Sequence, residues 1–435
     1  KMQRESSKHS MIWCLLLIWL APGTVSATSS TPSAEKLVAA AHAGKIDVVK
    51  AFLKTGIEVD ATGLGGTTAI MAAAAQGHTS LVKSLLQSSA EIDRTCAKGN
   101  TPLHWAARYG KTEVAKVLIQ KGADLNIKDN GGWSALSIAT HEGHLGIVKS
   151  LVKAGCDVES QEIEGYTALM WAGEEGRTDI IKVLTKAGAK LNVVNKRGQT
   201  ALMWAVYEGK EKAVAVLLGL GAKVNVQDKS GFTALHLAVE KNFVKIVRLL
   251  VVQKDIKVDL QDGRWLSPLI LAAKQSGIAS DEAVSLLIKA RAKLDLQDGK
   301  GFTALMWSAQ KKSVTKVRLL LEAGANVNVQ GTSENTALMN AAQEGASEIL
   351  TALIDDGAKL NMKDKENGFT ALMSACWFKH SDAVETLLNH GASCDVVSAY
   401  DSTALDIATE KGLTKIVSSL KKKCRKRKSA SHAEL

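Results

Sequence analysis

The feature that most constrains the fold of this chain is a short motif that recurs with nearly constant spacing. Its clearest copy reads Thr-Pro-Leu-His-Trp-Ala-Ala and starts at Thr101. The first residue of the motif, always Thr or Ser, recurs at intervals of 33 to 36 residues, at Thr68, Ser134, Thr167, Thr200, Thr233, Ser267, Thr303, Thr336, Thr370 and Thr403. A period of this length indicates a repeat array, in which each unit buries its apolar face only against its neighbours.

Each repeat has the pattern of two short helices followed by a turn. Thr101 precedes apolar residues with helical spacing, and its hydroxyl is placed to cap the first amides of a helix. Gly110 ends this helix, and a second apolar run with the same spacing starts at Val114 and ends before Gly122. A turn rich in Asp, Asn and Gly follows. Isolated helices shorter than roughly 12–15 residues are marginal in water, so these helices have to stack.

The motif, with its inter-helix glycine, an Ile/Val-x-x-Leu-Leu helix and a Gly-Ala-Asp-x-Asn turn, resembles the ankyrin repeat. The resemblance covers about residues 34–420 as roughly twelve units. It implies an all-α fold, an ankyrin-repeat α-solenoid of paired antiparallel helices with β-hairpin-like loops. Most units read Thr-Ala-Leu-Met instead, as at residues 167–170. Met there replaces the family's His, so we expect the usual His-to-Thr hydrogen bond to be missing and apolar packing to take its place.

The net charge of +11 lies mainly outside the repeats. Residues 421–435 hold seven Lys or Arg against one Glu, so the repeats themselves are close to neutral. This distribution argues against a nucleic-acid-binding array and predicts a basic, disordered tail over residues 421–435 with affinity for polyanions or anionic membranes. The candidate polyanion-binding residues are Lys421, Lys422, Lys423, Arg425, Lys426, Arg427 and Lys428.

Residues 1–27 have the pattern of a signal peptide, followed by a linker over residues 28–33. A short apolar run over residues 11–20 precedes a small-residue cleavage site at residues 25–27. We therefore expect a secreted or secretory-pathway protein, with a cytosolic or nuclear location as the alternative if the run is not used as a signal. The cysteines favour the alternative, because removal of Cys14 leaves five scattered residues with no metal-ligand spacing.

The two residues before the inter-helix glycine face a concave groove in the family that the motif resembles. Here they are rich in Glu and aromatic residues, which suits a basic or Arg-rich peptide, an ordinary solvated face being the alternative. Trp377 and Phe378 are adjacent, and two large aromatic side chains are costly to leave in water. The candidate partner-binding residues are Arg108, Tyr109, His141, Glu142, Glu174, Glu175, Tyr207, Glu208, Glu240, Trp377 and Phe378.

Aromatic and basic residues also recur at fixed positions elsewhere in the repeats. We expect core packing between neighbouring first helices for Trp105, Trp171, Trp204 and Trp307. We expect a stacked ladder along the hairpin tips for Trp133, Tyr166, Phe232, Phe302 and Phe369. A basic rim beside the tips consists of Lys98, Lys196, Arg197, Lys229, Arg264 and Lys300. In one irregular repeat, Trp265 takes the place of the hairpin glycine, and residues 277–281 are expected to lengthen the turn between the two helices.

No nucleotide-binding, metalloprotease or serine-hydrolase motif occurs in the sequence. We therefore predict a non-enzymatic scaffold, without catalytic residues, metal ligands, cofactor, small-molecule substrate or sequence-specific nucleic-acid partner. Its predicted function is to bind another protein through the concave groove and the hairpin tips. The alternative is a protein tethered to a polyanion or a membrane through the basic tail.

Overall fold

The computed structural model describes residues 32–431, and the side chains of residues 33–424. The predicted signal peptide and the linker up to residue 31 lie outside the described residues. The described residues form 24 α-helices in twelve pairs, which confirms the all-α ankyrin-repeat fold. Packing divides the chain into two units, with Lys196 the last residue of unit 1 and Arg197 the first of unit 2.

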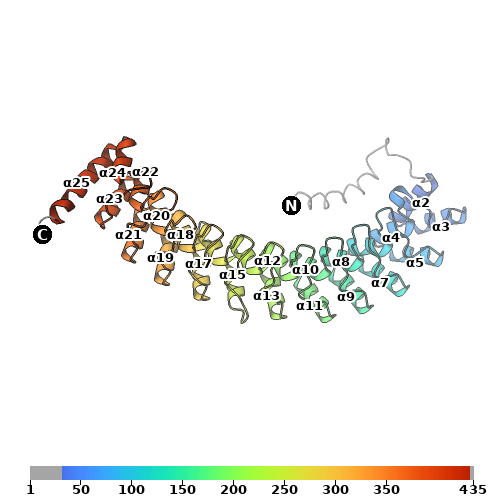
Figure 1. Ribbon diagram of the computed structural model, residues 1–435. Helices are drawn as coiled ribbons and strands as arrows, with labels where there is room; N and C mark the ends of the chain where they lie inside the picture. Colours follow the sequence, from blue (N-terminus) through green and yellow to red (C-terminus); the bar gives the residue numbers. More distant parts are fainter. Residues whose placement is uncertain (1–31, 432–435) are drawn as a thin grey trace. The chain divides into compact units, whose positions relative to one another are not determined.

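Unit 1 contains five helix pairs. They are α2 (Pro32–His42) and α3 (Ile46–Lys54), α4 (Ala69–Gln76) and α5 (Thr79–Gln87), α6 (Pro102–Arg108) and α7 (Thr112–Gln120), α8 (Ala135–Glu142) and α9 (Leu145–Lys153), and α10 (Ala168–Glu175) and α11 (Thr178–Lys186). Each even-numbered first helix contacts the next first helix, and from α5 on each second helix contacts the next second helix, so the unit has two rows of helices (Figure 1).

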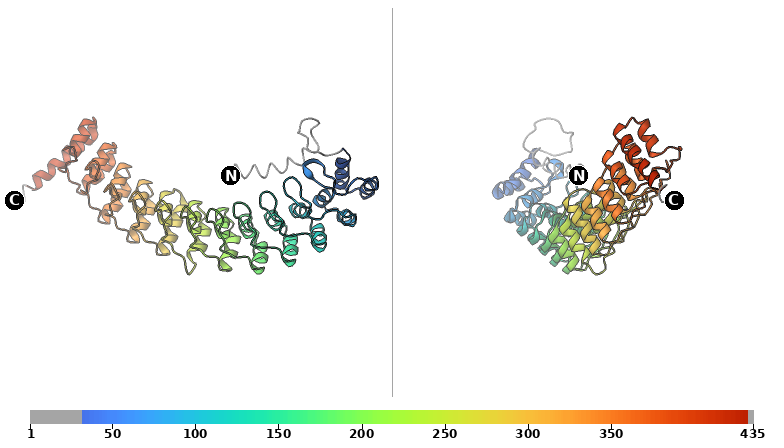
Figure 2. Two further views of the ribbon diagram at one scale, coloured as in Figure 1. Left: turned by 45° about the vertical axis from the view of Figure 1, so that its right-hand side comes forward. Right: turned by 90° about the vertical axis from the view of Figure 1, so that its left-hand side faces the viewer.

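Unit 2 contains seven helix pairs. They are α12 (Ala201–Tyr207) and α13 (Glu211–Gly219), α14 (Ala234–Glu240) and α15 (Val244–Val251), α16 (Pro268–Lys274) and α17 (Ile278–Lys289), α18 (Ala304–Gln310) and α19 (Val314–Glu322), α20 (Ala337–Gln343) and α21 (Ser347–Asp355), α22 (Ala371–Trp377) and α23 (Ser381–Asn389), and α24 (Ala404–Glu410) and α25 (Thr414–Ser431). Its first and second helices again form two rows (Figure 2).

The recurring Thr or Ser caps the first helix of its repeat, as the sequence predicts. Its side-chain oxygen accepts a hydrogen bond from the backbone amide three residues later in every copy of the motif except the one at Thr68. The methionines that replace His are buried, which confirms apolar packing at this position, at Met170, Met203, Met306, Met339 and Met373.

Two repeats keep the histidine, and both rings are buried. Nδ1 of His104 lies 2.8 Å from the Thr101 hydroxyl, and Nε2 lies 3.0 Å from the carbonyl oxygen of Trp133 in the next hairpin. His236 makes the equivalent contacts with Thr233 and Leu266. Each ring therefore joins a helix cap to the neighbouring repeat.

Burial lowers the pKa of His104 and of His236 below the usual 6.5. The folded protein thus holds both rings neutral at pH values where the unfolded chain is already protonated. Their contribution to stability is therefore complete above pH 6.5 and is lost as the pH falls from 6.5 towards the lower pKa of the folded state.

We expect the double variant His104→Met, His236→Met to lose less stability between about pH 7 and pH 5.5 than the wild type. Methionine already occupies this position in six other repeats and does not titrate. The measurement is the thermal midpoint at several pH values, followed by circular dichroism. The quantity to compare is the change of the midpoint with pH and not the midpoint itself, because the substitutions also remove hydrogen bonds. Parallel slopes for the two proteins would contradict the prediction.

The irregular repeat extends a helix and not a turn, so the sequence prediction for residues 277–281 is wrong. α17 begins at Ile278 and has 12 residues, against nine in most second helices. Ile278 is 86% exposed on the added helical turn. Trp265 does occupy the position of a hairpin glycine, with a φ of 62° and an exposed side chain.

A buried lysine closes the end of α16 in this repeat. Lys316, from α19 of the next repeat, is fully buried, and its ammonium group donates hydrogen bonds to the carbonyl oxygens of Ala272, at 2.9 Å, and Gln275. Asp281, in the added turn of α17, lies 3.7 Å from the same ammonium group. Other repeats have an apolar residue at the position of Lys316, such as Val114. The lysine therefore satisfies backbone groups that the irregular repeat leaves at the helix end.

The C-terminal helix differs from the sequence prediction in two respects. α25 continues to Ser431, so residues 421–431 are helical and the prediction of disorder is wrong for them. Cys424 on this helix forms a disulfide with Cys394, although the scattered spacing predicts unpaired cysteines. Cys96, Cys156 and Cys376 are free and buried, and burial raises the pKa of the Cys376 thiol to about 12.

Within residues 32–431, no helix combines the length and the apolar character that crossing a bilayer requires.

Candidate partner-binding surfaces

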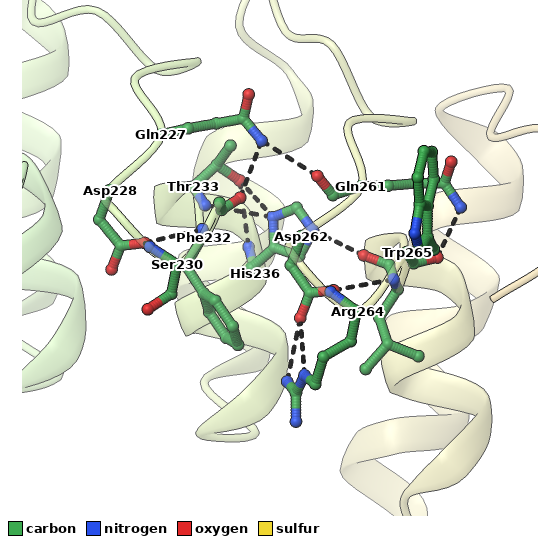
Figure 3. A network of polar contacts seen from close by, with 12 residues as sticks. Gln227, Asp228, Ser230, Phe232, Thr233, His236, Gln261, Asp262, Arg264 and Trp265 are labelled. Carbon is green, nitrogen blue, oxygen red and sulfur yellow. Dashed lines mark hydrogen bonds and ion pairs between the residues drawn. The ribbon is translucent and has the colours of Figure 1, made fainter. Parts of the chain in front are cut away.

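Acidic residues shape the hairpins that precede the first helices. Oδ1 of Asp228 accepts hydrogen bonds from the amides of Ser230 and Phe232, both at 2.9 Å (Figure 3). Asp262 and Asp298 bind two amides of their own hairpins in the same way. These hydrogen bonds hold the hairpin tips in one conformation.

Glutamine side chains join four successive hairpins of unit 2. The amide of Gln227 donates to the carbonyl oxygen of Gly231 in its own hairpin and to that of Gln261 in the next (Figure 3). Gln261 and Gln297 repeat this pattern, so the chain of contacts reaches the carbonyl oxygen of Gln330. We call these four residues the glutamine ladder. Sequence analysis missed it, although a Gln stands at the same place in each of the four repeats.

The predicted groove residues lie at the ends of the first helices and are all exposed or half-buried. In unit 1 these are Arg108, Tyr109, His141, Glu142, Glu174 and Glu175. In unit 2 they are Tyr207, Glu208, Glu240, Trp377 and Phe378. Their exposure makes them available to a partner, and their role as binding residues stays a prediction.

Four rings gather at the ends of α8 and α10 in unit 1. The Trp133 and Tyr166 rings stack on Trp171, with centroids 4.5 Å and 4.7 Å away. The His141 ring stands edge-on to both Trp133 and Trp171, at 5.6 Å and 5.3 Å. The two tip residues thus pack on a first helix, where the sequence predicts a ladder along the hairpins.

Carboxylates flank the His141 ring in this group. Nδ1 of His141 lies 3.2 Å from Oε1 of Glu142, and Nε2 lies 3.9 Å from Oε1 of Glu175. Arg177 lies 4.0 Å from the other oxygen of Glu175. The hydrogen bond from His141 holds the pKa of the Glu142 carboxyl below its usual value, so this group is ionised at neutral pH. We call Trp133, His141, Glu142, Trp171 and Glu175 the acidic–aromatic cluster.

In unit 2, lysine ammonium groups lie over aromatic rings of the first helices. The ammonium groups of Lys241 and Lys274 are 4.3 Å from the ring centroids of Tyr207 and Trp307, respectively. Lys411 lies 3.5 Å from the centroid of Trp377. Sequence analysis did not identify Lys274 or Lys411 as candidates. The signal was present, since both occupy the positions from which the groove residues were chosen.

The recurring tryptophans divide into two groups. Trp171 and Trp204 are buried, which confirms core packing for them, whereas Trp105 and Trp307 are only half-buried. The tip rings Phe302 and Phe369 pack on Trp307 and Trp377 of their own repeats, at 5.0 Å and 5.6 Å. In these two repeats a tip ring therefore packs on a tryptophan of the first helix.

Among the described residues, no group of His, Cys, Asp and Glu side chains has the arrangement of a metal site. His144, which lies three residues from His141, instead contacts the carbonyl oxygen of Arg108 through Nε2, at 3.2 Å. This contact ties the second helix of one repeat to the first helix of the preceding repeat.

Comparison with known families agrees with the helix pairs and caps described above. A model of three consecutive ankyrin repeats matches residues 37–129, 126–195, 187–262, 269–364 and 338–430. No curated protein gives a sequence match. Ankyrin repeats are generally protein–protein interaction modules and are typically non-enzymatic. With nearly every described helix inside a matched segment, this chain belongs to the ankyrin repeat family.

Proposed function

We propose that this protein is a non-enzymatic scaffold and that the acidic–aromatic cluster of unit 1 binds an Arg-rich segment of a partner protein. The observation that supports this proposal best is the placement of Glu142 and Glu175 on either side of the His141 ring, next to stacked tryptophans. Two carboxylates beside aromatic faces match the two ways in which a guanidinium group is recognised.

An arginine side chain pairs with a carboxylate through two parallel N–H donors and stacks its plane on an aromatic ring. Glu142 is exposed and Trp133 is half-buried, so a partner can reach part of both side chains. Lysine would make the ion pair but would lose the planar stacking. The proposal therefore favours arginine over lysine in the bound segment.

We expect the double variant Glu142→Gln, Glu175→Gln of the full chain to bind a fluorescent twelve-residue peptide of alternating Arg and Ser roughly tenfold more weakly than the wild type. Fluorescence anisotropy at fixed salt gives the dissociation constants. The matched control, Asp47→Asn with Glu113→Gln, removes two carboxylates from second helices of the same unit and should bind like the wild type. Equal affinity of both variants for the peptide would sink the proposal.

The alternative function, tethering to a polyanion or an anionic membrane through residues 421–428, stays a prediction. Lys421 and Lys422 are exposed. Lys423 instead lies 3.8 Å from Glu385 and also contacts Asn389, so part of its charge is used within the chain. Because of this pairing, we rank tethering through these residues below partner binding by the acidic–aromatic cluster.

We infer a location in the secretory pathway. The Cys394–Cys424 disulfide supports this inference, because structural disulfides persist mainly in oxidising compartments. Cleavage after Ala27 and release from expressing cells would test it.

A further inference from the structure

Three cationic side chains meet on the surface of unit 2 around α16. Lys274 lies at the end of α16, while Arg264 and Lys300 lie on the hairpins before α16 and before α18. Burial lowers the pKa of Lys274; the charge of Asp298 opposes this shift, and the charges of Arg264 and Lys300 add to it. Contacts between the two hairpins bring these residues together, because the amide of Gly299, next to Lys300, donates to the carbonyl oxygen of Arg264 at 3.2 Å. Asp298 accepts from the Lys300 amide and from the indole of Trp307, over which Lys274 lies. We call the three cations the basic cluster.

Aromatic rings line the basic cluster. Besides the contact of Lys274 with Trp307, the Arg264 guanidinium lies 5.5 Å from the centroid of the Phe232 ring, and Phe302 packs on Trp307. The Trp307 indole N–H donates to Oδ2 of Asp298 at 2.9 Å, which fixes the ring beneath Lys274. Because these side chains are already oriented by the rings, they lose little conformational freedom when a ligand binds.

The nearby carboxylates do not neutralise the cluster completely. Asp262 and Asp298 are only 5% and 8% exposed, and both bind backbone amides of their own hairpins. Asp262 also pairs with Arg264, at 3.0 Å. Among the described residues, no carboxylate lies within 4.0 Å of the Lys274 or Lys300 ammonium group. Within that part of the chain, two of the three cations thus lack an ion-pair partner.

The surrounding charges limit the size of the anion that fits. Glu240 is exposed on the preceding first helix, and Glu344 on a following repeat pairs with Lys312 at 3.5 Å. A long polyanion laid across several repeats would meet these carboxylates, whereas a short acidic segment would not. The aromatic rings further favour a peptide, which can place apolar side chains between its carboxylates.

We propose that the basic cluster and its rings form a second binding surface, which takes a short acidic peptide segment of a partner protein. This surface lies wholly in unit 2 and selects the charge opposite to that proposed for unit 1, so it does not depend on that proposal. Glu or Asp side chains of the segment pair with Lys274 and Lys300, and its apolar side chains contact Phe302 and Trp307.

The test uses the full chain and a fluorescent twelve-residue peptide in which Glu alternates with Ser, with one central Phe. We expect Lys274→Gln with Lys300→Gln to weaken binding about tenfold and Lys300→Gln alone about threefold. The control, Lys212→Gln with Lys289→Gln, removes two charges from second helices of unit 2 and should leave binding unchanged. Circular dichroism spectra that match the wild type would show that the variants are folded. If Lys274→Gln is unfolded, Lys300→Gln alone tests the proposal, because Lys300 is exposed on a hairpin.

Three results would overturn the inference: no binding of the acidic peptide by the wild type, equal weakening in the control, or tighter binding of a twelve-nucleotide oligo-dT or a heparin hexasaccharide than of the peptide. The arginine peptide, measured on the same proteins, reports on unit 1 separately. Its binding should be unaffected by the lysine variants. Failure of one surface is therefore distinguishable from failure of the other.

Discussion

Replacing Lys316 with alanine is expected to destabilise the middle of unit 2 by about 2–4 kcal/mol. The substitution removes the donor to two carbonyl oxygens at the end of α16, those of Ala272 and Gln275, and leaves a cavity where a fully buried side chain stood. Relief of the cost of burying a charge offsets part of this loss, since burial already lowers the pKa of Lys316.

Because each repeat contacts only its neighbours, the loss should be local. Hydrogen exchange of the full chain measures it, with faster exchange expected in α16, α17 and α19 and unchanged exchange in unit 1. Lys316→Met keeps most of the volume and should cost less than alanine. The control is Lys312→Ala, an exposed residue whose only described ion pair is with Glu344, and it should change exchange little. Similar effects of Lys312→Ala and Lys316→Ala would show that the buried hydrogen bonds are unimportant.

Removal of the Cys394–Cys424 disulfide is expected to destabilise the repeat formed by α24 and α25, here called the C-terminal cap, by about 3–4 kcal/mol. The bond closes a loop with a sequence separation of 30, and its loss returns that loop's conformational entropy to the unfolded chain. Within the cap, α25 also packs on α23 of the preceding repeat, where Lys423 contacts Glu385. Because a terminal repeat covers the apolar face of the repeat next to it, the loss of stability should spread inward from the end.

The variant Cys394→Ser with Cys424→Ser should therefore show faster hydrogen exchange in α24 and α25, and then in α22 and α23. Wild-type protein treated with reductant carries no substitution, serves as the control for effects of the serines, and should match the double serine variant. If the reduced wild type and the variant exchange as slowly as the oxidised wild type, the disulfide contributes nothing to the cap.

The repeat pattern predicts those features that depend on residues close together in one unit. The hydroxyl of Thr167, for example, caps a helix through an amide three residues away, so the contact is visible in the spacing alone. The exposure of Glu142 and Trp377 follows in the same way from their place at a helix end.

Features that join residues of different repeats could not be predicted from one unit. Lys316 lies 44 residues from Ala272, in a repeat whose neighbour has an added helical turn, and its burial depends on that addition. Cys424 lies on a helix that the charge of residues 421–428 made us expect to be disordered. The basic cluster combines a hairpin residue of one repeat with a helix end of another, and only the contacts between neighbouring hairpins and the Trp307 ring bring Arg264, Lys274 and Lys300 together.

The glutamine ladder has a direction, and this direction makes the two ends of unit 2 unequal. Each side-chain amide belongs to the earlier repeat, and each accepting carbonyl group belongs to the later one, as for Gln261 and Gln297. A second set of contacts also places the side chain in the earlier repeat and the backbone group in the later one: Oδ1 of Asn328, for example, accepts a hydrogen bond from the amide of Lys359. Truncation from the C-terminal side would strand side chains, which can rotate into water. Truncation from the N-terminal side would instead leave backbone groups without these partners, namely the carbonyl groups of the glutamine ladder and amides such as that of Lys359. These backbone groups are fixed in the hairpins, so unit 2 should tolerate shortening better from its C-terminal end.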